Sequence, residues 1–215
     1  PSRVTAEPSS RPPFASKPTM PSAPACAASA MPAMTKGEPT FVRTTLFAMP
    51  DVSTAELDAI AEDNIRSSGA VPSFKGYHGF PGSICASVND EVVHGIPGER
   101  VLAEGDVISI DCGAIVEGWH GDAATTVAVG EVPAEVTALS EVTRQAMWRG
   151  IAAARLGGRV TDISHAVETH VRAQGSYGIL EDYVGHGIGT EMHLPPNVPN
   201  YGKPGRGPRL VEGLA

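Results

Sequence analysis

The fold is decided by residues 107–129, VISIDCGAIVEGWHGDAATTVAV. Residues 107–115 are rich in β-branched side chains and predict a strand, and residues 120–129 predict a second one. Glu117 and Gly118 lie between the two runs, and a short turn that contains glycine is typical of a β-hairpin. We therefore expect two neighbouring antiparallel strands at this point of the chain.

The chain before the hairpin predicts a helix that begins at Ser53. Ser53 and Glu56 fit a capping box, in which each side chain binds the backbone amide at the other position. Gly69 lies just past the last apolar position, as expected where a helix ends. The apolar residues that recur at helical spacing are Leu57, Ile60, Ala61 and Ile65.

The regions on either side of the hairpin contain further short elements. Residues 84–88 are strand-like, and residues 92–93 begin another strand-like run that bends at Gly95 and Pro97. From Tyr183 onward the chain is rich in Gly and Pro, and we expect loops that cross the face carrying the functional site.

Two helices are predicted after the hairpin. The first covers residues 134–156 and ends at Gly157-Gly158. We expect Thr161 to cap the second, which continues to about residue 173 with Gly175 after it.

Composition restricts the class of protein. The chain has 215 residues, of which 41% are hydrophobic and 19% charged, which fits one globular domain. The net charge is −8 and no basic stripe is visible, so we expect no nucleic-acid binding. No apolar run approaches the roughly 20 residues that span a membrane. Cys26, Cys85 and Cys112 form no CxxC pair, which favours reduced thiols and a cytoplasmic location.

Residues 1–50 differ in composition from the rest and hold ten of the 19 prolines. Each proline removes a backbone donor and fixes φ, so no helix or strand period persists. We predict a disordered Pro/Ala/Ser-rich extension, followed by a catalytic domain over residues 51–215. The segment is also basic, Ser-rich and poor in acidic residues, so a transit peptide is an alternative, as is a wrongly placed gene start.

Two carboxylates mark the hairpin as a candidate site. Asp111 follows an apolar run, and Asp122 lies on the next strand, so we expect the two to lie opposite one another and to face one pocket. Carboxylates forced together repel unless a cation neutralises them, and a divalent metal ion would do so. The alternative is that each is a turn or cap residue.

Three histidines are candidates for the same site. His186 lies in Gly185-His186-Gly187-Ile188-Gly189, where glycines allow the backbone to approach a ligand, and His193 follows. Imidazole is a common ligand of transition metals. His94, in Val93-His94-Gly95-Ile96-Pro97, is a weaker candidate. Alternatively, these are a Gly-rich turn and structural histidines.

These segments resemble the type 1 methionine aminopeptidases. The resemblance covers roughly residues 50–215 and rests on motifs in the family's order: GYHGFP at 76–81, SVNDEVVHGIP at 87–97, Gly105-Asp106 leading to Asp111, His120-Gly121-Asp122, and GHGIG at 185–189. It implies an α+β, pita-bread (creatinase/aminopeptidase-like) fold, in which helices back a curved antiparallel sheet. It also implies metal-dependent removal of the N-terminal methionine from nascent proteins with a small second residue, by metal-activated attack of water on the first peptide bond.

The same resemblance assigns roles to individual residues. Two divalent ions (Co, Mn, Fe or Zn) would be held by Asp111, by a bridging Asp122 and by His186. His94 and His193 would contact the substrate and stabilise developing charge. The candidates for the methionine pocket are Tyr77, Phe80, Cys85 and Met192, with Phe74 weaker; the alternative for these is core packing. We expect nascent N-termini as partners, with transient ribosome contact, no membrane association and a monomer.

The sequence departs from the family in two places. The helix expected before Val52 is not found. Two further glutamate ligands are expected beyond His193, one of them in an Ile-Glu-Pro strand, and Glu212 lies too early to be either. We therefore expect a truncated chain with an incomplete fold and doubtful activity of its own. The rival interpretations are a prolidase or aminopeptidase P, and a non-catalytic binding protein of the same fold.

Overall fold

The computed structural model describes residues 47–215. Residues 1–46 of the predicted extension lie outside the described part of the chain. The predicted hairpin is confirmed: β3 (Val107–Val116) and β4 (Trp119–Ala128) are antiparallel. Glu117 and Gly118 form the turn with φ of 51° and 84°. Positive φ at both positions gives the twist that a two-residue hairpin turn requires.

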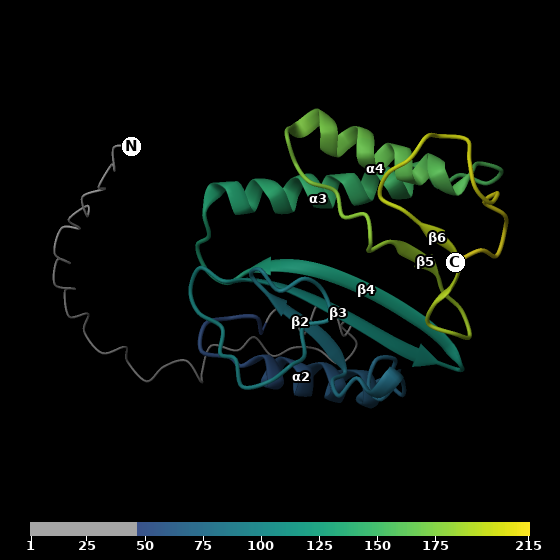
Figure 1. Ribbon diagram of the computed structural model, residues 1–215. Coiled ribbons are helices and arrows are strands. Elements are labelled where there is room, and N and C mark those ends of the chain that lie inside the picture. The colour runs from purple at the N-terminus through teal and green to yellow at the C-terminus, as the bar shows by residue number, and fades with distance from the viewer. Residues whose placement is uncertain (1–46) are drawn as a thin grey trace, which may run out of the picture. The chain divides into compact units, whose positions relative to one another are not determined.

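Strand β3 is the centre of a four-stranded antiparallel sheet (Figure 1). β4 pairs along its whole length, while β2 (Ile84–Val88) and the short β1 (Val71–Pro72) pair with successive parts of β3. A second sheet consists of β5 (Gly185–Gly187) and β6 (Leu194–Val198). The Gly/Pro-rich segment after Tyr183, predicted as loops, therefore contains two short strands.

Helix α2 (Thr54–Ser67) covers one face of the four-stranded sheet. Its capping box is confirmed: the Glu56 carboxylate accepts from the Ser53 amide at 2.8 Å, and the Ser53 hydroxyl accepts from the Glu56 amide at 3.2 Å. The core between helix and sheet includes Leu57, Ala61, Ile65, Ile84, Ala86, Val88, Leu102, Ile108, Ile110 and Val129. Phe47 and Ala48, from the end of the predicted extension, also pack there.

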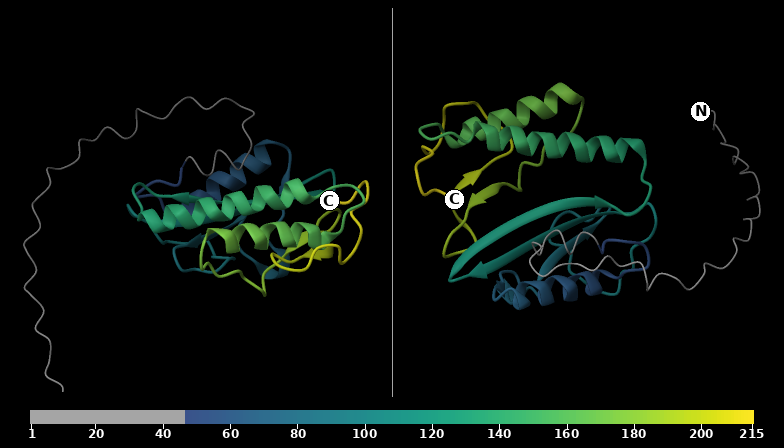
Figure 2. Two further views of the ribbon diagram at one scale, coloured as in Figure 1. Left: turned by 90° about the horizontal axis from the view of Figure 1, so that it is seen from above. Right: turned by 180° about the vertical axis from the view of Figure 1, so that it is seen from behind.

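Helices α3 (Ala134–Ala153) and α4 (Val160–Gln174) lie on the other side of the sheet from α2, as two views show (Figures 1 and 2). They approach closely at Gly150, where an added Cβ would lie 2.9 Å from a methyl group of Val167. No helix within residues 47–215 combines the length and apolar character needed to cross a membrane.

Three local predictions are wrong or need adjustment. Residues 92–93 form no strand, because Val93 and His94 have φ of 24° and 60° and turn the backbone away from an extended path. Thr161 is not the cap of α4 but lies within it, and its hydroxyl donates to the carbonyl of Arg206. Helix α3 ends at Ala153, three residues earlier than predicted.

Candidate functional site

The two hairpin aspartates share one face of the sheet but do not lie directly opposite, as we had expected. Asp111 pairs with Ala124 and Asp122 with Gly113, so the carboxylates meet diagonally. Burial, and then the neighbouring Asp122 charge, raise the pKa of Asp111 to about 7. A cation bound beside this desolvated pair would therefore favour the charged carboxylates.

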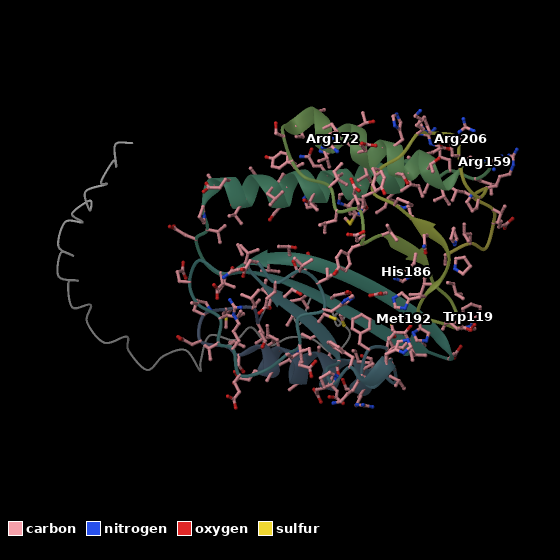
Figure 3. The ribbon with its side chains drawn as sticks, viewed as in Figure 1. Trp119, Arg159, Arg172, His186, Met192 and Arg206 are labelled. Atoms are coloured by element: carbon pink, nitrogen blue, oxygen red, sulfur yellow. The ribbon has the colours of Figure 1, made fainter. Side chains whose placement is uncertain are left out.

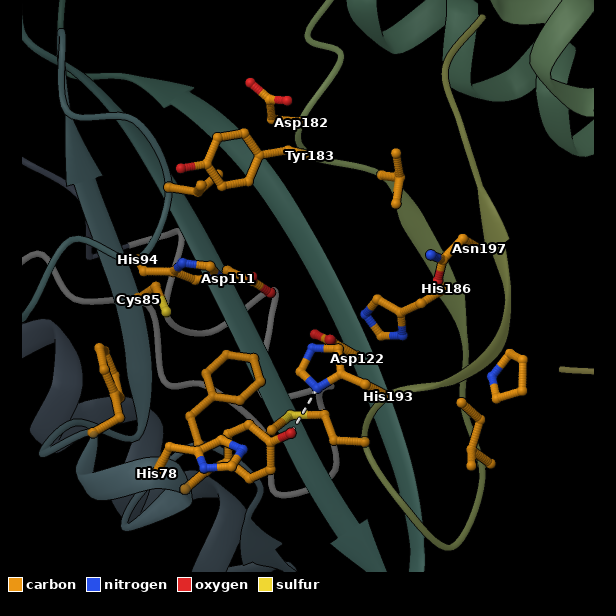
Figure 4. Close-up of a pocket in the computed structure, with 18 of the residues that line it drawn as sticks. His78, Cys85, His94, Asp111, Asp122, Asp182, Tyr183, His186, His193 and Asn197 are labelled. Carbon is orange, nitrogen blue, oxygen red and sulfur yellow. Dashed lines mark hydrogen bonds between the residues drawn. The ribbon is translucent and has the colours of Figure 1, made fainter. Parts of the chain in front are cut away.

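A cavity of about 1170 Å³ opens over this face (Figure 4). It brings together segments that are far apart in the sequence: the 74–80 turn, the 93–96 loop, the hairpin and the 182–197 segment. All nine predicted site residues line it: Tyr77, Phe80, Cys85, His94, Asp111, Asp122, His186, Met192 and His193. The weaker candidate Phe74 lines it as well.

The β5–β6 segment is held against the tip of the hairpin. The His120 amide donates to the carbonyl of Gly189 at 2.8 Å, and a Cβ added at Gly189 would lie 3.7 Å from the ring of Trp119, which is labelled in Figure 3. Within this segment Gly187 allows β5 to approach β6 closely, because a Cβ there would lie 2.6 Å from the carbonyl oxygen of Pro195. The Gly-rich run thus places His186 beside the aspartates.

One nitrogen of the His186 ring makes a hydrogen bond, and the other has a lone pair that could bind a metal ion. Nδ1 lies 3.0 Å from the carbonyl of Gly187, and since a carbonyl only accepts, Nδ1 carries the proton. Nε2 of the neutral ring then keeps its lone pair, which is the arrangement that metal-binding histidines adopt. The ring centroid of His193 lies 4.4 Å away.

His193 lines the cavity from the 182–197 segment, and His94 lines it from the 93–96 loop. Nδ1 of His193 lies 2.9 Å from the hydroxyl of Tyr77. Burial, and then the nearby His186, lower the pKa of His193, which favours its neutral form. His94 follows the strained Val93 in a left-handed turn, with its ring 6.4 Å from that of Tyr183.

A small apolar cluster forms one wall of the cavity. Phe74, Cys85 and Met192 are buried together, and Phe80 packs against them. Burial, and then the charges of Asp111 and Asp122, raise the pKa of the Cys85 thiol to about 12. Both Cys85 and Cys112 are free thiols, as predicted, and Cys85 acts here as an apolar side chain.

Several lining residues were missed by sequence reasoning, including Asp182 and Tyr183. They lie just before the GHGIG run, and that proximity is the signal that could have identified them. Val93 and Ile96, which flank His94, also line the cavity. All four residues are therefore part of the cavity wall.

The residues fit a divalent cation in chemistry, although they are not closed into a ligand shell. Within residues 47–215, no three His, Cys, Asp or Glu side chains converge tightly enough to hold a metal ion. Asp111 and Asp122 nevertheless supply paired carboxylates, and His186 supplies an imidazole with a free lone pair. This mixed oxygen and nitrogen donor set suits Mn, Fe, Co or Zn.

Comparison with known proteins decides the family. The model of metallopeptidase family M24 matches residues 25–214. The chain belongs to family M24. A methionine aminopeptidase of Clostridium acetobutylicum is 57% identical over 168 residues, which cover 78% of this chain and 67% of that protein. Methionine aminopeptidase 1 of Mycobacterium tuberculosis is 56% identical, with 77% and 65% covered. This M24 chain thus spans about two thirds of the length of these relatives.

A solved structure agrees with the sequence comparison. The crystal structure of methionine aminopeptidase from Rickettsia prowazekii matches with a TM-score of 0.79 at 38% identity, over 81% of this chain and 70% of that one. The M24 pita-bread fold predicted from the motifs is therefore confirmed. Membership of a metallopeptidase family also implies the use of divalent metal.

Proposed function

We propose that this M24 chain carries the catalytic site of a methionine aminopeptidase, which removes the N-terminal methionine from proteins. The observation that carries the proposal is one cavity that joins the anionic Asp111–Asp122 pair and the free Nε2 of His186 to an apolar wall. The close relatives that bear this name support it.

In the proposed mechanism, Asp111, Asp122 and His186 would be the residues that hold the divalent metal. Such ions supply Lewis acidity and activate water for attack on a carbonyl. Asp111 and Asp122 compensate the positive charge in a partly dry site. His94 and His193 flank the reacting bond and donate hydrogen bonds to the oxygen that gains negative charge.

The methionine side chain would occupy the apolar wall formed by Phe74, Phe80, Cys85 and Met192. A thioether packs well against aromatic and sulfur-containing side chains. Among residues 47–215, no Lys or Arg lines the cavity, whereas three aspartates do. A free α-amine is cationic and is attracted to such a site, which would restrict cleavage to the first residue.

The proposed substrates are the N-termini of newly made cytoplasmic proteins with a small second residue. Contact with the ribosome would be transient, and a monomer without membrane association would suffice. The rings of Tyr183 and His94 lie 6.4 Å apart on the cavity wall, and they would limit the room for a second side chain that bound beside them. The proposed preference for small second residues has this physical basis.

The test is peptide hydrolysis by the 215-residue chain with Mn²⁺ or Co²⁺. Met-Ala-Ser should be cleaved after methionine, although slowly, because residues 47–215 supply only three of the five ligands that the resemblance implies. N-acetyl-Met-Ala-Ser, which lacks the free amine, should not be cleaved. A matched Ala-Pro-Ser peptide separates this activity from the prolidase and aminopeptidase P alternative. Preferential cleavage of Ala-Pro-Ser would overturn the proposal, and tight binding of Met-Ala-Ser without turnover would favour a non-catalytic binding protein.

A further inference from the structure

Tyr77 and His193 are joined by a hydrogen bond within the cavity, although 116 positions separate them in the sequence. The Tyr77 hydroxyl lies 2.9 Å from Nδ1 of His193 (Figure 4), and the ring centroids are 5.5 Å apart. Apolar packing in a pocket wall requires only the ring of Tyr77 and not a hydrogen bond from its hydroxyl. The hydroxyl therefore has a partner that the role of a pocket wall does not explain.

The backbone that carries Tyr77 is a tightly bonded turn. The Tyr77 amide donates to the carbonyl of Phe74 at 2.9 Å, and the Phe80 amide donates to the carbonyl of Tyr77 at 2.9 Å. Gly76 has a φ of 88°, a conformation that glycine adopts at little cost. The phenol is thus presented from a fixed support, as a positioning group requires.

The chemistry of the two groups sets the direction of their hydrogen bond. A phenol is a stronger acid than a neutral imidazole N–H, and an imidazole nitrogen is a better acceptor than a phenol oxygen. The Tyr77 hydroxyl therefore donates, and Nδ1 of His193 accepts. A neutral histidine that accepts at Nδ1 carries its proton on Nε2.

We propose that Tyr77 is a positioning residue that fixes the ring orientation and tautomer of His193, so that Nε2–H points into the cavity as a hydrogen-bond donor. In Figure 4 the other nitrogen of the His193 ring lies on the side of Asp122 and His186, which both line the cavity. One part rests on the proposed function: the acceptor of this bond is the carbonyl oxygen of the first peptide bond. That oxygen gains negative charge as water adds, and a preorganised donor stabilises it.

The tautomer can be measured on the metal-free chain by ¹⁵N NMR of the histidine rings, with His193→Gln to assign the signals. In the unsubstituted chain His193 should show a protonated Nε2 and an unprotonated Nδ1. Tyr77→Phe removes only the hydroxyl and should give a mixture of tautomers. Tyr201→Phe is the matched control, since Tyr201 is also 38% exposed but lies outside the cavity, and it should leave the His193 signals unchanged.

The kinetic test uses Met-Ala-Ser and the same two variants. Tyr77→Phe should lower kcat by about 10- to 100-fold, as expected when a group that orients a functional histidine is removed. KM should change by less than about threefold, because the apolar wall remains. In a His193→Ala background, Tyr77→Phe should cause no further loss of kcat.

The outcomes separate this inference from the proposed function. An unchanged His193 tautomer in Tyr77→Phe would overturn the inference, as would a raised KM with unchanged kcat or an additive loss in the His193→Ala background. A tautomer change without any hydrolysis of methionine peptides would support the positioning role while the proposed function failed.

Discussion

Asp122 pairs across the hairpin with Gly113 and not with Asp111, so the two carboxylates lie diagonally on one face of the sheet. Gly113 leaves room beside Asp122, and the ring of Phe74 fills part of it, since an added Cβ would lie 2.7 Å from that ring. The diagonal offset lets both carboxylates point at one position from different strands. The carboxylates are close enough for Asp122 to raise the pKa of Asp111, and a shared cation would relieve this repulsion.

The first prediction concerns the stability of the metal-free chain as a function of pH. The folded pKa of Asp111 is about 7, raised from 3.8 by burial and by Asp122. Between these values the unfolded chain releases a proton that the folded chain retains, so stability due to this group is present below pH 4 and is lost as pH rises to 7.

Urea unfolding with EDTA, from pH 4 to pH 8, measures this effect. The free energy of unfolding of the unsubstituted chain should fall from pH 4 to pH 7, and that of Asp111→Asn should fall less. The variant should therefore gain stability relative to the unsubstituted chain as the pH rises. Asp63→Asn, an exposed position on α2, is the control for a change of net charge. If the difference between Asp111→Asn and the unsubstituted chain did not vary with pH, the raised pKa would be contradicted.

The second prediction concerns metal binding. Asp111→Asn, Asp122→Asn and His186→Ala should each weaken Mn²⁺ binding by more than about 100-fold, since loss of a ligand costs more than loss of a group supporting one. Asp182→Asn is matched in charge and lines the same cavity, but lies outside the proposed ligand set. It should change the affinity by less than about threefold, because exposed charges are screened.

Isothermal titration calorimetry compares the four variants directly. Equal weakening by Asp182→Asn and Asp122→Asn would show that the cavity attracts cations only through its general negative charge. Loss of binding in the three ligand variants alone would instead identify specific ligands.

Local patterns predicted much of this fold. The capping box of Ser53 and Glu56 and the hairpin turn at Glu117 and Gly118 depend on neighbouring residues, so the sequence contains their full signal. The same two-residue turn also fixes the register. Pairing of Val116 with Trp119 places Asp111 opposite Ala124, so the expectation of directly opposed carboxylates was wrong.

The remaining features depend on contacts between distant segments. Nothing near Val93 predicts its positive φ, which opposes the preference of a β-branched residue. The loop that contains Val93 is bonded to β2 through Gly95, which contacts Ala86 and Ser87, and such contacts leave no local signal in the sequence. Similarly, the bond between Tyr77 and His193 exists only once two segments meet over the hairpin. The motifs predicted which residues gather, but not which atoms bond.

The third prediction concerns the attachment of α2 to β2. The Asp58 carboxylate accepts from the amides of Ser83 at 2.6 Å and Ile84 at 2.9 Å, and both of these residues are fully buried. Asp58→Ala should reduce the free energy of unfolding by about 2–4 kcal/mol, because two buried donors lose their acceptor. Asp58→Asn keeps an acceptor oxygen and should lose less.

Urea unfolding of the two Asp58 variants at pH 7 provides the measurement, with Asp63→Ala on the same helix as the control. Equal losses in Asp58→Ala and Asp58→Asn would point to the negative charge and not to the hydrogen bonds. A loss below about 0.5 kcal/mol in Asp58→Ala, the range of ordinary surface substitutions, would contradict the prediction.

The last prediction concerns Gly95, which holds the His94 loop against β2. The Gly95 carbonyl accepts from the Ala86 amide at 2.8 Å, and the Gly95 amide donates to the Ser87 hydroxyl at 3.0 Å. A Cβ at this position would lie 2.3 Å from the Ala86 carbonyl oxygen, which is backbone and cannot rotate away. Gly95→Ala should therefore push the loop off the strand, with a loss of stability of about 1–3 kcal/mol or more.

The consequence for the site is a displaced His94. Tm and urea unfolding measure the stability, and the NMR signals of the His94 ring report its position without requiring activity. Gly178→Ala is the matched control, since nothing lies within 4 Å of its added Cβ, and it should be close to neutral. If Gly95→Ala were as stable as Gly178→Ala and left the His94 signals in place, close backbone contact would not be what positions this histidine.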